Sequence, residues 1–160
     1  MNNQFSFSYA ALAGLAATTA MTLFTYMTPL MGIQMNIPVM LAGTFGTPFI
    51  IGWLMHYMIG TILAINYAAL FLPRFGGSNL VKAGVLFSII PWLMAQIIVM
   101  PMMAIMNGAN YSAGFFSGSI MMALASLMGH LLYGVVLGLI YKPGTAENIN
   151  HQFSSGTVAK

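Results

Sequence analysis

Residues 115–141 read FFSGSIMMALASLMGHLLYGVVLGLIY and contain no Asp, Glu, Lys or Arg. A helix needs about 20 apolar residues to cross the roughly 30 Å hydrocarbon core of a bilayer. Three further stretches meet this requirement, at residues 9–31, 49–72 and 81–106, whereas residues 37–44 are apolar but too short. The runs are continuous rather than alternating, which excludes the strands of a closed β-barrel. We therefore expect an all-α membrane fold, a bundle of four transmembrane helices with an interfacial turn or short helix at 37–44.

The composition of the whole chain favours the same class. Of its 160 residues, 59% are hydrophobic and 3% are charged, whereas soluble domains carry about a quarter charged residues. One acidic residue and no cysteine exclude carboxylate pairs, thiolate metal sites, disulfides and carboxylate-driven transport. Four scattered Lys and Arg residues form no patch for nucleic acid. The expected surroundings are therefore a lipid bilayer.

The basic residues predict the orientation of the chain. Arg74 and Lys82 lie at the connection between the second and third expected helices, and Lys142 directly follows the fourth. Basic residues are enriched on the cytoplasmic side of membrane proteins, so both termini are predicted to be cytoplasmic, in the cell inner (plasma) membrane. Residues 1–141 are expected to form the transmembrane domain and residues 142–160 a disordered cytoplasmic tail.

The second and fourth expected helices share one pattern, a histidine in a row of small residues spaced by four. The rows are Gly52, His56, Gly60, Ala64 and Ser126, His130, Gly134, Gly138. Residues four apart share a helix face, and small residues let helices approach closely in lipid. The first and third helices also begin alike, with Ala13-Gly14 and Ala83-Gly84. The pattern predicts an internal repeat of two helical hairpins in parallel orientation, packed through these rows.

His56 and His130 are the intramembrane ionisable groups, and Gln96 with the threonines of the first helix is expected at comparable depth. Three interpretations stay open. The histidines hydrogen-bond to Gln96, the threonines or a backbone carbonyl. Alternatively they ligate a b-type haem, with Gly60 and Gly134 making room for the macrocycle, or one of them donates a hydrogen bond to a quinone or another lipid-like molecule.

The sixteen methionines add a metal hypothesis. Thioether and imidazole groups bind Cu(I), and methionines flank the histidines in Met55-His56-Tyr57-Met58 and in Met128-Gly129-His130. Methionine also fills helices at positions where leucine would serve, which is the simpler explanation.

Four short motifs resemble an uncharacterised family of small prokaryotic four-helix integral membrane proteins, a domain of unknown function. They are Ala13-Gly14 with Thr18 and Met21, Gly52-Trp53-Leu54-Met55-His56, Met100-Pro101, and His130-Leu131-Leu132-Tyr133-Gly134. The resemblance implies the four-helix topology and supports the importance of His56 and His130, and it names no reaction.

No complete catalytic set accompanies the two histidines. The sequence therefore favours a non-enzymatic bundle, an accessory subunit of a membrane assembly or a homo-oligomer. The alternative is a cofactor-binding membrane protein that uses His56 and His130 for a b-type haem or a quinone.

Overall fold

The computed structural model describes residues 5–75 and 79–144, and these residues fold as helices joined by short connections. The long helices are α1 (Phe7–Met27), α3 (Phe49–Asn66), α5 (Leu80–Met94) and α8 (Ile120–Ile140). The short ones are α2 (Ile37–Thr44), α4 (Leu72–Phe75), α6 (Met100–Met106) and α7 (Tyr111–Gly114). Four stretches are long and apolar enough to cross a membrane: Phe7–Met31, Phe49–Phe75, Leu80–Met106 and Ile120–Ile140. The predicted all-α fold with four spans is confirmed.

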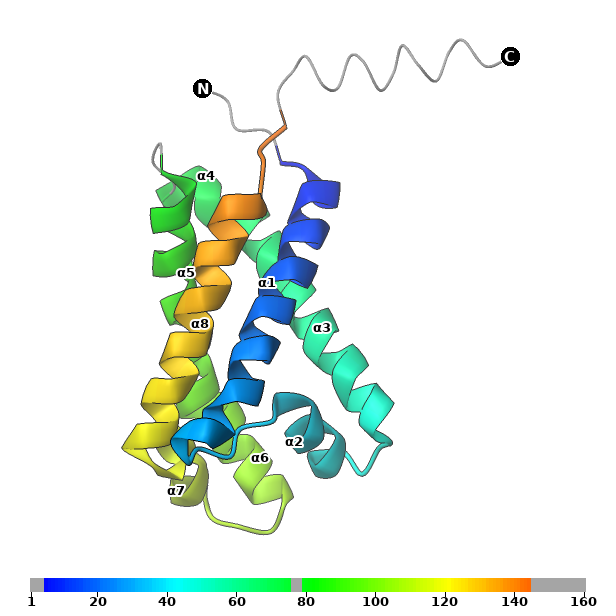
Figure 1. Ribbon diagram of the computed structural model, residues 1–160, viewed down its shortest axis with the longest axis vertical. Helices are drawn as coiled ribbons and strands as arrows, with labels where there is room; N and C mark the ends of the chain where they lie inside the picture. The colour runs from blue at the N-terminus through cyan, green and yellow to red at the C-terminus, as the bar shows by residue number, and fades with distance from the viewer. Residues whose placement is uncertain (1–4, 76–78, 145–160) are drawn as a thin grey trace, which may run out of the picture.

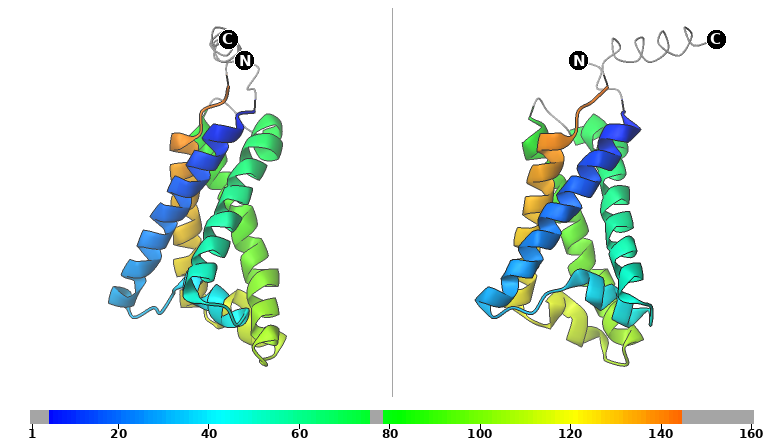
Figure 2. Two further views of the ribbon diagram at one scale, coloured as in Figure 1. Left: turned by 90° about the vertical axis from the view of Figure 1, so that its right-hand side faces the viewer. Right: turned by 45° about the vertical axis from the view of Figure 1, so that its right-hand side comes forward.

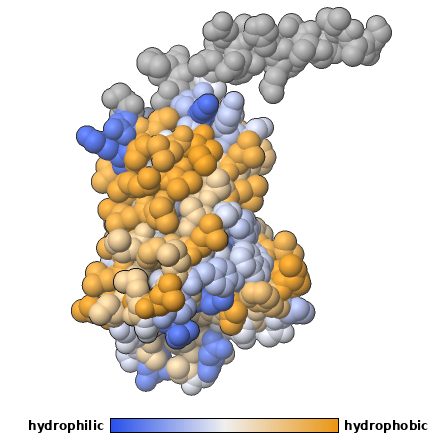
Figure 3. Space-filling model, viewed as in Figure 1, coloured by the Kyte–Doolittle hydropathy of each residue, from blue (hydrophilic) through white to orange (hydrophobic). Residues whose placement is uncertain are grey.

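Helix α1 lies between α3 and α8, while α5 packs on the other side of α8 and α2 packs against α3 (Figure 1). Both turned views show α1 running obliquely across the bundle (Figure 2). On the face drawn in Figure 3, hydrophobic side chains cover most of the upper half, the most hydrophilic ones lie near the top and in the lower part, and a weakly hydrophilic patch lies at the right of the lower half. Large apolar residues such as Leu54, Leu86 and Leu124 are more than half exposed, as the lipid-facing surface of a membrane bundle requires.

Close contacts through glycine hold α1 to α3 and α5 to α8. A Cβ atom at Gly14 of α1 would lie 2.8 Å from Cβ of Ala64 on α3. A Cβ atom at Gly84 of α5 would fall on the carbonyl oxygen of Gly134 on α8. In lipid no hydrophobic effect drives helices together, and the van der Waals contacts made at such short distances stabilise the pairs instead. The small-residue rows therefore face neighbouring helices, as their spacing predicts.

Two tyrosines tie the hairpins to one another at one end of the bundle. Tyr67, at the end of the first hairpin, donates its hydroxyl hydrogen to the carbonyl oxygen of Leu80 at 2.8 Å. Tyr141, at the end of the second, accepts from the backbone N–H of Ser6 at 3.3 Å. The two rings pack edge to face with centroids 5.9 Å apart. The start of α1, the end of α8, the start of α5 and the segment of α4 with Arg74 therefore share one end of the molecule.

Proline shapes the other end of the third span. Pro101 has no N–H with which to bond the carbonyl oxygen of Ile97 one helical turn earlier. The hydroxyl of Tyr111 donates to that carbonyl oxygen instead, at 2.5 Å. Because an unsatisfied carbonyl is costly within a bilayer, this bond anchors α7 beside α6.

Several predicted boundaries need correction. The fourth span begins at Ile120 rather than at residue 115, because Phe116 and Ser117 adopt left-handed backbone with φ of 49° and 56°. The first span begins two residues earlier than predicted, at Phe7, and the second runs on to Phe75. The predicted short helix at 37–44 is confirmed. Most of the predicted tail, residues 145–160, lies outside the described residues.

Candidate functional site

His56 is buried on α3 and joins that helix to α1. Its Nε2 lies 3.0 Å from Oγ1 of Thr22. The Thr22 hydroxyl donates its own hydrogen to the carbonyl oxygen of Thr18, at 2.7 Å. Its oxygen therefore accepts from His56, which places the imidazole proton on Nε2. His56 is thus a cross-helix donor, one of the partnerships that the sequence predicts.

His130 makes a different bond on α8. Its Nδ1 lies 2.8 Å from the carbonyl oxygen of Ser126, one turn earlier on the same helix. Because a carbonyl oxygen only accepts, Nδ1 carries the proton and the lone pair of Nε2 is available. Among the described residues no hydrogen bond to Nε2 is present. His130 is half-buried, whereas His56 is 7% exposed.

Gln96 lies in a π-helical turn, Ala95–Val99, that interrupts the third span. It is 1% exposed and is bonded at both ends of its amide. Its Nε2 donates to Oγ of Ser126 at 3.1 Å, and its Oε1 accepts from Oγ of Ser117 at 2.7 Å. Gln96 therefore binds α8 to the left-handed turn that precedes it. Insertions of this kind occur frequently at functional sites.

Gly60 and Gly134 lie where helices touch rather than beside open space. The place of a Cβ at Gly60 is taken by the Thr18 hydroxyl of α1, and the carbonyl oxygen of Gly60 accepts from Tyr133 at 2.6 Å. The place beside Gly134 is taken by the backbone of Gly84. Both glycines serve packing here, so a haem beside them would require the helices to separate.

The structure does not gather the sequence-predicted residues into one cluster. Ser126 connects Gln96 with His130, whereas His56 pairs separately with Thr22. Met58 and Met128, which flank the histidines in sequence, are 55% and 57% exposed. Both side chains lie on the surface, whereas the ring of His56 is buried.

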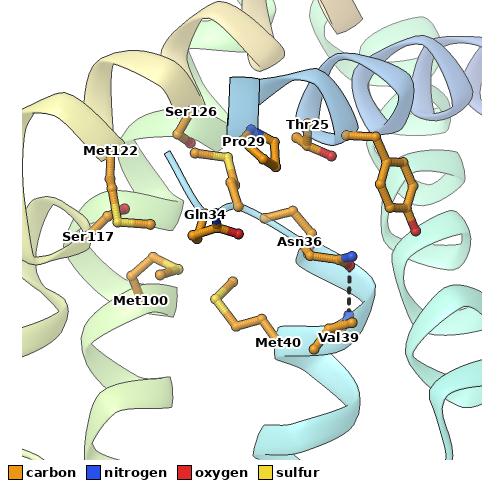
Figure 4. Close-up of a pocket in the computed structure, with 13 residues that line it drawn as sticks. Thr25, Pro29, Gln34, Asn36, Val39, Met40, Met100, Ser117, Met122 and Ser126 are labelled. Carbon is orange, nitrogen blue, oxygen red and sulfur yellow. Dashed lines mark hydrogen bonds between the residues drawn. The ribbon is translucent and has the colours of Figure 1, made fainter. Parts of the chain in front are cut away.

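A pocket with a volume of about 430 Å³ lies on the side of Ser126 away from the termini (Figure 4). Its walls come from the end of α1, the following connection, α2, α6, the turn before α8, and α8 itself. The lining residues are Thr25, Tyr26, Pro29, Gln34, Met35, Asn36, Ile37, Val39, Met40, Met100, Ser117, Met122 and Ser126. Both serines held by Gln96 are among them, so the buried amide supports the pocket wall.

The pocket escapes sequence reasoning because its residues are scattered over six segments of the chain. Each methionine alone is typical of helix packing. The one available signal is local: Met35 and Met40 flank Asn36, whose side chain accepts from the N–H of Val39 at 3.1 Å and begins α2. That cap stabilises the start of α2, which forms one wall of the pocket.

The described residues contain no group of three or more His, Cys, Asp and Glu side chains that would hold a metal ion. Four membrane-spanning stretches, glycine-mediated packing and a neutral pocket define a small multi-pass helical membrane protein. The chain belongs to the family of unknown function DUF6789, whose model matches residues 6–151. No curated protein and no solved structure matches it.

Proposed function

We propose that this membrane protein is a non-catalytic binding protein whose site is the pocket bounded by α1, α2, α6 and α8. The observation that carries the proposal is the composition of the pocket wall. Apolar and thioether side chains surround a few fixed amide and hydroxyl groups, which is the usual make-up of a small-ligand site. No ionised side chain is among the lining residues, so the ligand is uncharged or is a soft ion.

The binding site is proposed to face the outer side of the membrane. Arg74, Lys82 and Lys142 all belong to the end of the bundle that carries the Tyr67 and Tyr141 contacts. The pocket lies towards the opposite end, where α2 and α7 are located. Enrichment of basic residues on the cytoplasmic side then places both termini in the cytoplasm.

Native mass spectrometry tests the binding function with a matched pair of variants. Met122 lines the pocket, while the neighbouring Met121 is 62% exposed on the outer face of α8. Met122→Trp fills the pocket and Met121→Trp does not. Protein released from its own membranes is expected to carry a bound mass that only Met122→Trp loses. Equal masses in all three proteins would refute the proposal.

Cysteine labelling tests the orientation, since the chain has no cysteine of its own. Gln34→Cys, at the pocket, is expected to react in intact cells with a maleimide that cannot cross membranes. Phe75→Cys, exposed at the basic end, is expected to react only after the cells are opened. The reverse pattern would place the termini outside.

A histidine-held cofactor is the second candidate, and one observation favours it. In many haem and metal sites a ligating imidazole donates its other N–H to a carbonyl, and His130 donates from Nδ1 in this way. Binding at His56 through Nε2 would require loss of the bond to Thr22. A Soret band in wild type that both His56→Ala and His130→Ala remove would establish this function over the first.

An accessory role in a membrane assembly is compatible with either kind of ligand. It predicts that the protein released in mild detergent migrates in native electrophoresis with a partner or a second copy. Migration of the single chain alone would argue against it.

A further inference from the structure

We propose that the ligand of the pocket is a soft monovalent cation, Cu(I) or its analogue Ag(I), held by methionine thioethers. The inference rests on the proposed binding function and names the ligand class. Four of the thirteen lining residues are methionines, against 16 of 160 in the whole chain. They are Met35, Met40, Met100 and Met122.

These methionines come from separate parts of the structure. Met35 precedes α2, Met40 lies within it, Met100 begins α6, and Met122 lies in α8. A single helix in lipid produces a methionine stripe by packing alone, but three helices and a connecting segment that converge on one space do not form such a stripe. Figure 4 shows the side chains of Met40, Met100 and Met122 extending into the same space from different walls.

The chemistry of the donors selects the ion. Thioether sulfur is a soft, uncharged ligand that suits Cu(I), whereas Ca²⁺ and Mg²⁺ require several oxygen ligands, usually with carboxylates among them. The described residues contain no Asp or Glu. Neutral donors are also sufficient for a monovalent ion, because only one charge has to be transferred from water into the pocket.

The pocket is open to the surface, and its methionine side chains are flexible enough to bind an ion. Val39 is 51% exposed and Gln34 is exposed, so the pocket can be reached from the surface. Methionine has three rotatable side-chain bonds, so the sulfur atoms adjust to an ion without movement of the backbone. The bonds from Gln96 to Ser117 and Ser126 fix the wall behind Met122.

Competition against a coloured Cu(I) chelator tests the inference on the full-length protein in detergent micelles under reducing conditions. The wild type is expected to remove one Cu(I) per chain, with only sulfur neighbours in the copper X-ray absorption spectrum. Even a group outside the ligand shell contributes about 10–100-fold in metal affinity. Each of Met40→Leu, Met100→Leu and Met122→Leu is therefore expected to weaken binding at least tenfold, and the triple variant to abolish it.

The control removes the same number of methionines from elsewhere. Met58, Met121 and Met128 are all more than half exposed and do not line the pocket. Their triple leucine variant is expected to bind Cu(I) like the wild type. Leucine conserves the volume of methionine at low cost in stability, so circular dichroism should show all variants folded.

The outcomes separate this inference from the binding function. Equal loss of Cu(I) in the control variant, or retention in the pocket variant, would overturn the Cu(I) site. If no Cu(I) binds but Met122→Trp alone loses a bound organic mass, the pocket is a binding site and only the ion assignment fails. If neither readout responds to the pocket variants, both proposals fail.

Discussion

The two hairpins of the bundle share their glycine contacts and differ in their polar contacts. In the first, Gly14 of α1 meets α3, and in the second, Gly84 of α5 meets α8. The histidines occupy the same position in the two small-residue rows, yet His56 bonds across to α1 whereas His130 bonds within α8. The glycines that the hairpins share therefore serve helix packing. The histidine bonds differ between the hairpins: one joins two helices and the other stays within one helix.

The connections at the pocket end enlarge this difference. The first hairpin inserts α2 between its spans, and α2 packs against α3. The second hairpin has only α7 and the tight turn Phe115–Gly118, which Gln96 holds in place. The pocket forms where these unlike connections meet. The two hairpins therefore have similar sequences near Tyr67 and Tyr141. The pocket lies at the opposite end, where the connections of the two hairpins differ.

The largest expected effect comes from breaking the contact of the second hairpin. In Gly84→Ala the new methyl group would fall on the Gly134 carbonyl, which cannot move aside as a side chain would. We expect a loss of about 3 kcal/mol in the free energy of unfolding, measured by denaturant titration in micelles. The control is Gly129→Ala, whose methyl group would meet only Met21 and Phe24 at 3.5–3.6 Å. Similar losses in both variants would contradict close packing at Gly84.

Gln96→Leu is expected to have the next largest effect and to act on the second hairpin alone. The variant leaves the hydroxyls of Ser117 and Ser126 without their amide partner. Two lost bonds predict a decrease of about 2 kcal/mol in the same titration. Gln34→Leu, at an exposed position, should change stability by less than about 0.5 kcal/mol. A neutral Gln96→Leu would show that the amide does not brace the turn.

The histidines give a sharper test of the difference between hairpins. His56→Leu removes a buried bond between two helices and is expected to lower the free energy of unfolding by about 1 kcal/mol. His130→Leu removes a bond within one helix turn, so about 0.5 kcal/mol is expected. Thermal unfolding of both variants side by side measures the order. An equal or larger loss of stability in His130→Leu would show that the bond between helices contributes no more than the bond within α8.

Small effects, close to that of His130→Leu, are expected for the tyrosines that join the hairpins. Tyr67→Phe removes a bond of 2.8 Å and should lower the free energy of unfolding by about 0.6 kcal/mol. Tyr141→Phe removes a longer bond of 3.3 Å and should cost less. Both rings stay in place in these variants. A larger cost at Tyr141 would show that the longer contact is the more important one.

Hydrophobic runs and four-residue spacing predict the spans and their packing faces, since both follow from local sequence. The start of the fourth span could not be predicted, because positive φ at Phe116 and Ser117 is rare for residues with side chains and here accompanies a bond from Ser117 to Gln96 in a distant segment. The same reason applies to the site. Sequence spacing identifies His56 and His130, but the bond of His56 to Thr22 and the convergence of Met40, Met100 and Met122 are set by tertiary structure.

The paired bonds of Tyr67 and Tyr141 also impose an order on biosynthesis. During translation Tyr67 leaves the ribosome before Leu80, and Ser6 precedes its partner by nearly the whole bundle. When the first hairpin has been made, the hydroxyl of Tyr67 still lacks its partner Leu80. The N–H of Ser6, before α1, lacks its partner until Tyr141 has been made. The bundle can therefore close at this end only after the fourth span has been synthesised.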